Sequence, residues 1–303
     1  MRVLIVGAGG QLGGELSAVF SASGAEVLGA DREHAEHSVD IRDQASATAL
    51  LDRLRPDITV NTAAFHQLEE CERSPVEAFA VNAAGAMHLA RACAATGSRL
   101  VHLSSNYVFG ATPVVEAGMA GPRPYRETDR PGPLNVLGAS KLAGEHLAAA
   151  WCPDHVIIRT AALYGVGVSR GRGRNFVDSM LQLAAMRRPA KVIDDIVTTP
   201  TWSGALAAQV RLLAEKGEPG LYHATCGGCC SWHDFARAIF EEAGVDAALT
   251  RTKTAAFQAP VRRPAYSALE NAHAAAQGLD IMPPWRDALR AYLEQRGVRA
   301  RGA

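Results

Sequence analysis

A glycine-rich turn near the N-terminus is the feature that most limits how this chain can fold. Residues 2–6, RVLIV, form a short β-branched apolar run typical of a buried parallel strand. Gly7, Gly10 and Gly13 follow, and the apolar spacing after them is helical. A tight turn between a strand and a helix N-terminus brings backbone amides close to a pyrophosphate and stabilises its charge. The pattern predicts a dinucleotide site, because the glycines lie between strand and helix as that motif requires.

The rest of the chain alternates between predicted strands and helices. Apolar runs predict strands over residues 25–31, 57–64, 99–106 and 155–160. Helical periodicity predicts helices over residues 75–97 and about 136–150. This alternation predicts an α/β fold, a Rossmann-type doubly wound parallel sheet with a smaller α/β substrate domain built mainly from the C-terminal third. We expect the NAD(P)-binding domain to hold residues 1–163 and about 190–222. The substrate domain then takes about 164–189 and 223–303.

The end of the second predicted strand bears on the choice of cofactor. Asp31 closes this strand, where its carboxylate can accept hydrogen bonds from an adenosine ribose. Arg32 follows and can instead pair with a 2′-phosphate, so NADH and NADPH both stay open. Asn82, inside a helix, is either a polar structural pin or a solvated side chain, and its apolar neighbours favour the pin. The predicted cofactor contacts are Gly7, Gly10, Gln11, Leu12, Gly13, Asp31, Arg32, Asp40, Ile41, Ala63, Ala64 and Asn82.

Composition argues against several other classes of protein. Lys+Arg and Asp+Glu are equal at 31 each, so no net field recruits nucleic acid or a membrane surface. No stretch approaches the roughly 20 apolar residues of a membrane span, and we expect no signal peptide and a cytoplasmic location. The six cysteines fit free thiols in a reducing compartment. We expect no metal site, because Cys226, Cys229 and Cys230 lack an obvious fourth ligand other than His223 or His233.

Longer segments of the chain resemble one known family. The similar stretches are LVHLSSNYVFG, YRETDRPGPLNVLGASKLAGE, IIRTAALYG, RNFVDSML, VIDDIVTTPTWSGALA, LYHATCGGCCSWHDFARAIF and RRPAYSALE. In order and spacing they resemble dTDP-4-dehydrorhamnose reductases, of the extended short-chain dehydrogenase/reductase type. The resemblance covers essentially the whole chain. It implies a Rossmann domain with a small sugar-nucleotide domain, and NADPH or NADH reducing the 4-keto group of a dTDP-linked 6-deoxyhexose.

The mechanism that this resemblance implies needs three groups. A tyrosine donates a proton to the carbonyl oxygen, and a lysine four residues later holds the nicotinamide ribose and lowers the tyrosine pKa. A Ser or Thr hydroxyl bonds the carbonyl, and residues four apart share one helix face. Lys141 matches the lysine, as cofactor and catalytic residue, and Ser105 matches the hydroxyl. The tyrosine position, however, holds Leu137, which has no proton to donate.

Further departures from the family lie on the expected hexose side. Asn106 replaces the usual acid before YVF, Ala162 replaces the tryptophan of RTSWLYG, and the segment 194–201 lacks the usual glutamine and glycine. The cofactor side therefore matches the family and the hexose side does not. The substrate contacts that the resemblance implies are Ser105, Asn106, Val108, Phe109, Ala162, Asn175 and Arg263. Arg170, Arg172 and Arg174 form a basic loop that is a further candidate clamp for a diphosphate.

Three interpretations of these departures stay open. In the first, the protein reduces a 4-keto sugar nucleotide with another proton source, for which Tyr107, Tyr125, Tyr164 and His66 are candidates. Tyr107 lies two residues after Ser105, so both would face one side of an extended strand. In the second, a similar enzyme acts on a different, less polar substrate. In the third, the chain is an NAD(P)-binding regulatory subunit without turnover, like the regulatory subunit of methionine adenosyltransferase, which resembles this family. A small-molecule substrate is expected in the first two, and a homodimer is compatible with all three.

Overall fold

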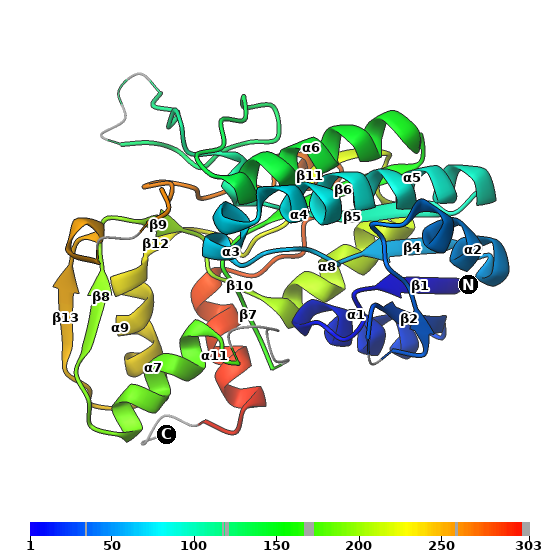
Figure 1. The fold of residues 1–303 in the computed structure, drawn as a ribbon. Helices are drawn as coiled ribbons and strands as arrows, with labels where there is room; N and C mark the ends of the chain where they lie inside the picture. The colour runs from blue at the N-terminus through cyan, green and yellow to red at the C-terminus, as the bar shows by residue number, and fades with distance from the viewer. Residues whose placement is uncertain (34, 117, 119–120, 167–172, 258–259, 299–303) are drawn as a thin grey trace.

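A seven-stranded parallel sheet forms the centre of the larger unit in the computed structural model (Figure 1). The structure describes residues 1–33, 35–116, 118, 121–166, 173–257 and 260–298. The strand order is β11-β6-β5-β4-β1-β2-β3. The strands are β1 (Arg2–Val6), β2 (Glu26–Asp31), β3 (His37–Ser38), β4 (Ile58–Asn61), β5 (Arg99–Ser105), β6 (His155–Thr160) and β11 (Gly220–His223). The order reverses beside β1, which is where doubly wound sheets bind their ligands.

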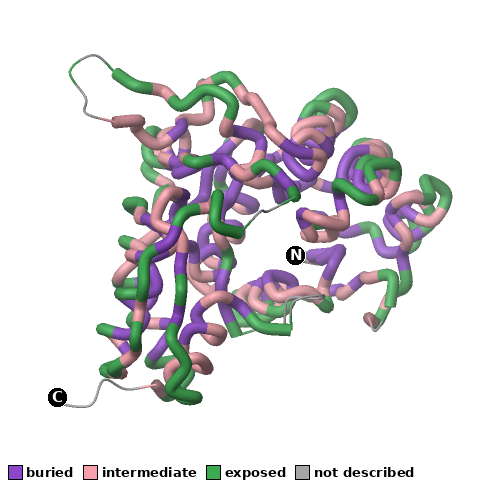
Figure 2. Tube along the Cα trace, turned by 60° about the vertical axis from the view of Figure 1, so that its left-hand side comes forward, coloured by how far each residue is buried: buried purple, intermediate pink, exposed green. Residues whose placement is uncertain are grey.

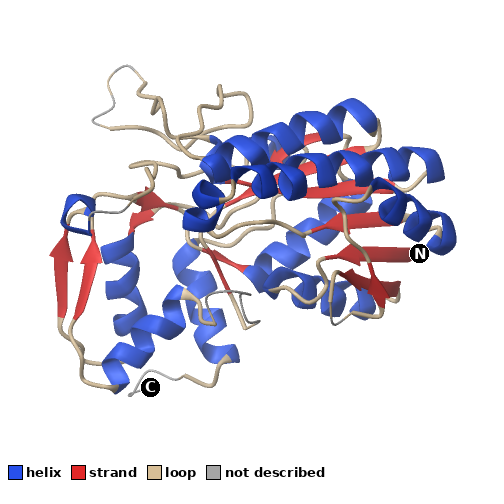
Figure 3. Ribbon diagram, in the orientation of Figure 1, coloured by secondary structure: helices blue, strands red, loops and turns tan. Residues whose placement is uncertain are grey.

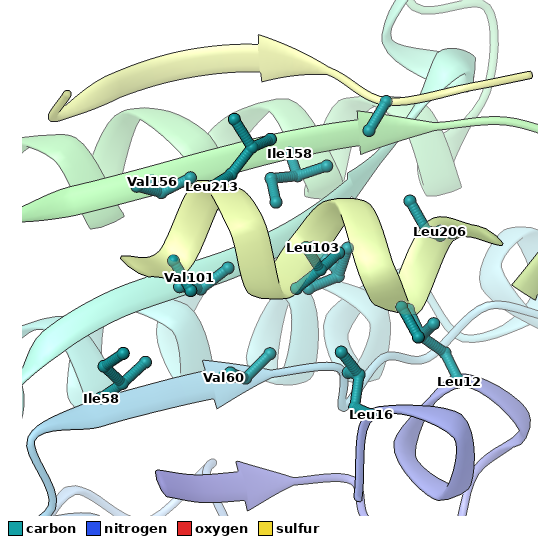
Figure 4. Close-up of a cluster of buried hydrophobic side chains, with 14 of the residues drawn as sticks. Leu12, Leu16, Ile58, Val60, Val101, Leu103, Val156, Ile158, Leu206 and Leu213 are labelled. Carbon is teal, nitrogen blue, oxygen red and sulfur yellow. The ribbon is translucent and has the colours of Figure 1, made fainter. Parts of the chain in front are cut away.

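Helices cover both faces of this sheet (Figure 3). On one face α1 (Gln11–Ala22) packs beside α8 (Ser203–Lys216). Figure 4 shows Leu206 and Leu213 of α8 over apolar side chains of the sheet such as Val101. The other face is covered by α2 (Gln44–Leu54), α5 (Gly85–Thr96) and α6 (Val136–Trp151), with Leu51 and Leu89 buried between helix and sheet. The strands are therefore buried on both sides, as their continuous apolar runs predict (Figure 2).

The helix predicted over 75–97 is present but changes its winding. It consists of α4 (Pro75–Phe79), a π-helical turn η1 (Ala80–Ala84) and α5, preceded by α3 (Leu68–Arg73). Helix α6 packs closely on this turn, since a Cβ added to Gly144 would lie 2.1 Å from the carbonyl oxygen of Asn82. Gly144, the second glycine of GASKLAGE, thus allows a close approach of two backbones next to the pocket described below.

A smaller unit lies at one end of the sheet. Its core is formed by α7 (Phe176–Ala185), α9 (Trp232–Ala243) and α11 (Trp285–Gln295), packed with the parallel pair β8 (Ala190–Ile193) and β13 (Leu249–Thr252). Short pairs complete it: β7 (Leu163–Tyr164) with β10 (Thr201–Trp202), and β9 (Val197–Thr198) with β12 (Cys230–Ser231). Ser231 caps α9 as its sequence position suggests, with its hydroxyl accepting from the Asp234 amide at 3.0 Å.

The expected boundaries between the units need correction. Residues 190–193 were expected in the dinucleotide domain, but β8 pairs with β13 in the smaller unit. The segment joins the larger unit only with α8, from Ser203. Conversely, α10 (Ala272–Ala276) packs against β11, and Ala274 belongs to the core of the larger unit. The chain therefore crosses between the units more often than the expected boundaries allow.

Among the described parts of the chain, no helix has both the length and the apolar character needed to cross a membrane.

Candidate active site

One cavity of about 700 Å³ opens at the carboxyl ends of the strands, where the two units meet. The larger unit contributes the glycine turn, the ends of β2, β4, β5 and β6, and one face of α6. The smaller unit contributes Leu163, Arg174, Asn175, Phe176 and Trp232. This is the edge at which open α/β sheets bind ligands.

The glycine turn has the close backbone contacts that a dinucleotide cradle needs. Gly7 has φ +87°, and a Cβ there would lie 2.5 Å from the Thr62 hydroxyl. A Cβ on Gly13 would lie 2.3 Å from the carbonyl oxygen of Gly7, so the first turn of α1 rests directly on the loop. Gly10, Gln11 and Leu12 line the cavity at the helix N-terminus. The side-chain nitrogen Nε2 of Gln11 is buried and has no hydrogen-bond partner within the described ranges. The turn therefore fits a bound pyrophosphate.

Carboxylates and guanidiniums lie together in the part of the cavity wall that follows β2. Asp31 accepts hydrogen bonds from the Arg32 amide at 2.7 Å and the Gly9 amide at 3.2 Å. Arg42 hydrogen-bonds Asp40, which holds the pKa of that carboxyl below its usual range, and it reaches Glu77 at 2.6 Å. All of these residues except Gly9 line the cavity, together with Ile41, Ala63 and Ala64. Arg42 and Glu77 were missed from the sequence, although Arg42 directly follows the predicted Asp40-Ile41.

Asn82 lies behind the cavity wall instead of lining it. Its side-chain oxygen accepts from the Phe65 amide at 2.9 Å, and its nitrogen donates to the Phe65 carbonyl at 2.8 Å and the Ser140 hydroxyl at 3.0 Å. Phe65 itself lines the cavity. The expected cofactor contact is thus replaced by the structural role of a pin between η1, α6 and this loop.

Ser105 and Lys141 face the same cavity from β5 and α6. The Ser105 hydroxyl accepts from the Tyr107 amide at 3.2 Å and so caps a short 3₁₀ turn, η2 (Asn106–Val108). The Lys141 ammonium donates to the Leu103 carbonyl at 2.8 Å, which leaves two of its three N–H groups for other partners. Burial lowers the pKa of Lys141 to about 8, while the charge of Glu145 one turn further along α6 acts in the opposite direction.

A buried ion pair supports the floor of this site. Arg159 donates to both carboxylate oxygens of Glu145, at 2.9 and 2.6 Å, and Ser104 donates to Glu145 at 2.5 Å. The end of β5 is therefore fastened to α6 at two successive residues, by Leu103 to Lys141 and by Ser104 to Glu145. Ser105 comes immediately after these two anchors.

Leu137 lines the cavity one helical turn before Lys141, as the four-residue spacing predicts. Its side chain packs in an apolar cluster with Leu68, Cys71, Ala78 and Val261. Asn135 caps the helix start, its side-chain oxygen accepting from the Gly138 amide at 2.9 Å. The position that carries a tyrosine in the resembling family is thus correctly placed but has no acidic group.

The predicted substrate residues divide into those at the cavity and those away from it. Asn106, Ala162 and Asn175 line it. Asn106 donates to the Ser267 hydroxyl at 2.8 Å, which joins η2 to the C-terminal part of the chain. Asn175 caps α7 and donates to the Gly165 carbonyl at 2.7 Å. Both amides therefore hold the walls of the cavity. Ala162 has φ +43°, a left-handed conformation uncommon for a residue with a Cβ.

Val108, Phe109 and Arg263 depart from the expected substrate contacts. Val108 and Phe109 are completely buried, in a core cluster with Tyr125 and Leu269. Phe109 stacks on Tyr125 with ring centroids 4.2 Å apart. Arg263 pairs with Glu69 at 2.5 Å and is not part of the cavity wall formed by the described residues. Of the basic loop, Arg174 lines the cavity, whereas Arg170 and Arg172 lie outside the described residues.

The cavity wall that includes Leu137 and Ala162 also contains apolar residues that no motif in the sequence indicates. These are Phe65, Leu68, Leu163, Phe176 and Trp232. Trp232 also contacts Phe176, with ring centroids 4.7 Å apart. Only the fold could reveal this set, since its members come from four separate segments. Within the described ranges, no group of three or more His, Cys, Asp or Glu side chains is arranged to hold a metal ion.

The parallel sheet, the glycine cradle and the paired Ser105 and Lys141 define a Rossmann-type nicotinamide-dinucleotide-binding protein of the short-chain dehydrogenase/reductase class. Residues 1–297 match the family model described as RmlD substrate binding domain, and the chain belongs to this family.

Individual relatives agree with this assignment over almost their full length. The spore coat polysaccharide biosynthesis protein SpsK of Bacillus subtilis is 38% identical over 297 residues, which cover 97% of this chain and 98% of that protein. A dTDP-4-dehydrorhamnose reductase of Mycobacterium tuberculosis is 39% identical over 290 residues, 95% of this chain and 91% of that protein. The crystal structure of dTDP-4-dehydrorhamnose reductase from Bacillus anthracis in complex with NADP has a TM-score of 0.88 and 30% identity, covering 97% and 99% of the two chains. The predicted family and Rossmann fold are confirmed.

Proposed function

We propose that this protein uses NADPH or NADH to reduce the 4-keto group of a dTDP-linked 6-deoxy sugar. The observation that carries the proposal is that one cavity joins the dinucleotide cradle at Gly7 and Gly10 to the polar pair Ser105 and Lys141. The name dTDP-4-dehydrorhamnose reductase, borne by a relative that matches 95% of this chain, supports the substrate class.

When bound, the reduced nicotinamide supplies the hydride that is transferred to the carbonyl carbon. The protein's part is to orient the ketone and to stabilise the charge that develops on its oxygen. The Ser105 hydroxyl, fixed at the end of β5, donates a hydrogen bond to that oxygen. Lys141 holds the nicotinamide ribose with the N–H groups not used by Leu103, and its charge makes the site electropositive.

A second candidate function is the reduction of a less polar ketone by the same residues. The specific observation that favours it is that Phe65, Leu68, Phe176 and Trp232 line the same cavity as Leu137 and make part of its wall apolar. An apolar wall disfavours a hexose, whose hydroxyl groups lose hydrogen bonds to water when they are buried without partners.

The first test is the loss of nicotinamide absorbance when the purified protein meets dTDP-4-dehydro-L-rhamnose, with NADH and NADPH in parallel. We expect turnover, and mass spectrometry of the product should show the addition of two hydrogen atoms. Lys141→Met should weaken cofactor binding and lower kcat. Lys191→Met, an exposed lysine on β8, serves as the matched control. Tight cofactor binding without turnover on this substrate would contradict the proposal and favour the less polar substrate or the regulatory subunit.

We also infer a cytoplasmic location and a homodimer. All six cysteines are free thiols, which suits a reducing compartment. Light scattering of the purified protein tests the homodimer, and a mass near 32 kDa, that of one chain, would contradict it.

A further inference from the structure

Reduction of a ketone needs a proton as well as a hydride, and Leu137 cannot supply it. We propose that Tyr107 is the proton donor of this enzyme, reaching the carbonyl oxygen from the η2 turn instead of from helix α6. The inference rests on the proposed reductase function and names one residue of that site.

The other tyrosine candidates lie away from the cavity. Tyr125 is 1% exposed, stacks on Phe109 and donates its hydroxyl to the Thr112 carbonyl at 3.1 Å. Tyr164 is 1% exposed in the core of the smaller unit, where burial raises its pKa well above the usual value. Neither lines the cavity, so neither phenol can meet a substrate bound there. Tyr107 is the one tyrosine in the cavity wall formed by the described residues.

Tyr107 lies beside the position from which the hydroxyl is missing. A Cβ added to Gly138 would be 2.1 Å from the Tyr107 carbonyl oxygen, so the η2 backbone touches α6 one residue after Leu137. The Tyr107 side chain packs against the apolar cluster that contains Leu137 and Leu68. Both Tyr107 and Leu137 line the cavity. Leucine is shorter than tyrosine, so it leaves room beside the reacting oxygen for a phenol that comes from η2.

The surroundings suit proton transfer from this turn. The Ser105 hydroxyl accepts from the Tyr107 amide, so the residue that binds the carbonyl also fixes the turn that carries Tyr107. Lys141 places a cation in the same cavity, and a nearby cation stabilises a phenolate. His66 also lines the cavity but is an exposed residue, whereas Tyr107 is partly buried against α6. A buried donor is better suited to a reaction from which water is excluded.

The atoms and electrons balance with one proton and one hydride. The reduced nicotinamide would supply the hydride, one of its C–H bonds breaking as it is oxidised by two electrons, and a new C–H bond forms at the carbonyl carbon while the C=O π bond breaks. The O–H bond of Tyr107 breaks at the same time, and its proton forms the new O–H bond of the alcohol. The phenolate then recovers a proton from water at the mouth of the cavity.

The decisive variants are Tyr107→Phe and the exchange Tyr107→Phe/Leu137→Tyr. Loss of a general acid typically costs about 10²–10⁴-fold in rate, so we expect kcat of Tyr107→Phe to fall by about that factor. The Kd of NADPH, measured by fluorescence titration, should stay within about twofold. The kcat of the exchange variant should be at least about tenfold higher than that of Tyr107→Phe, because the exchange returns a phenol to α6 one turn before Lys141. Tyr125→Phe removes a phenol oxygen outside the cavity and serves as the matched control, with kcat unchanged.

Binding of the keto sugar nucleotide to the protein saturated with NADP⁺ gives a readout without turnover. Tyr107→Phe should weaken this binding about three- to tenfold, since it removes a hydrogen bond to the carbonyl oxygen. The kcat of the wild-type enzyme should also show a solvent deuterium isotope effect that is lost in Tyr107→Phe.

The outcomes separate the two proposals. If the wild type reduces the sugar nucleotide and Tyr107→Phe keeps its kcat within threefold, water or Lys141 is the donor and the assignment of Tyr107 is overturned. If the wild type binds NADPH but none of the keto sugar nucleotides causes its oxidation, the proposed function fails and the role of Tyr107 fails with it.

Discussion

Lys141 illustrates how one buried charge is made tolerable by its immediate partners. Taking an ammonium out of water is costly, and here burial lowers the pKa of Lys141 to about 8. The bond to the Leu103 carbonyl and the negative charge of Glu145 offset part of that cost. Glu145 is in turn paired with Arg159, so three buried charges carry a net charge of +1 behind the site. A buried cation that costs stability here is explained by a role in binding an anionic or electron-rich ligand.

Asp31 is the residue on which we expect cofactor preference to depend. Its carboxylate lines the cavity at the end of β2, where a 2′-phosphate of NADPH would bring about two further negative charges. Asp31→Asn should therefore lower the ratio of the NADPH dissociation constant to the NADH dissociation constant by about tenfold. The reason is that it removes one negative charge that repels the 2′-phosphate. Fluorescence titration with each cofactor measures the ratio. Asp43→Asn, which keeps a capping side chain on α2 outside this cavity, is the control. A ratio that moves by less than twofold in Asp31→Asn would show that this carboxylate does not discriminate.

At the scale of elements, the contact between the first turn of α1 and the glycine loop positions the dinucleotide cradle. The contact has no room for a side chain at Gly13, while a Cβ added to Gly14, the next residue of the same helix, would meet open space. Similar glycine contacts hold α6 to η2 at Gly138 and to η1 at Gly144. The cavity is therefore shaped by backbones in direct contact, which makes its dimensions sensitive to single methyl groups.

Gly13 and Gly14 offer a matched pair of substitutions to alanine. Gly13→Ala should lower the free energy of unfolding by about 2 kcal/mol or more and weaken NADPH binding at least tenfold, because its Cβ would overlap the Gly7 carbonyl. Gly14→Ala should raise the stability by about 0.5–1 kcal/mol, the helix preference of alanine over glycine, and leave the Kd unchanged. Urea unfolding and cofactor titration measure both. Equal effects from the two substitutions would contradict the assigned contact.

At the scale of the whole molecule, local signals in the sequence were sufficient to predict most helices and strands. They were not sufficient to predict which residues far apart in the chain pair with one another. The β1 strand and the glycine turn are encoded by neighbouring residues, and they could be predicted. The pairing of β8 with β13 joins residues about 60 positions apart, and the contact of Arg263 with Glu69 spans 194 positions. Such contacts depend on how the two units pack. For the same reason the boundary at 190 was misplaced, and Arg263 was expected in the site.

Two buried histidines make the free energy of unfolding depend on pH. His102 lies in β5 and accepts from the Asn61 amide group at 3.1 Å. His223, at the end of β11, lies 3.1 Å from the carbonyl oxygens of both Tyr125 and Glu270. Burial lowers the pKa of each to about 3, against an ordinary value of 6.5. Between these values the unfolded chain binds protons that the folded protein does not, so stability falls as the pH decreases below about 6.5.

We expect each histidine to contribute about 2 kcal/mol to the loss of unfolding free energy between pH 7.5 and pH 5. Urea unfolding of the wild type at the two pH values measures the total loss, and His223→Gln should reduce it by that amount. His146→Gln, on the exposed side of α6, should leave the loss unchanged. Nuclear magnetic resonance supplies a test that does not depend on the stability of the variant, since the ring signals of His102 and His223 should not titrate between pH 8 and pH 5. Ring signals that shift in that range would show that water reaches these side chains and that the core is less closed than the packing indicates.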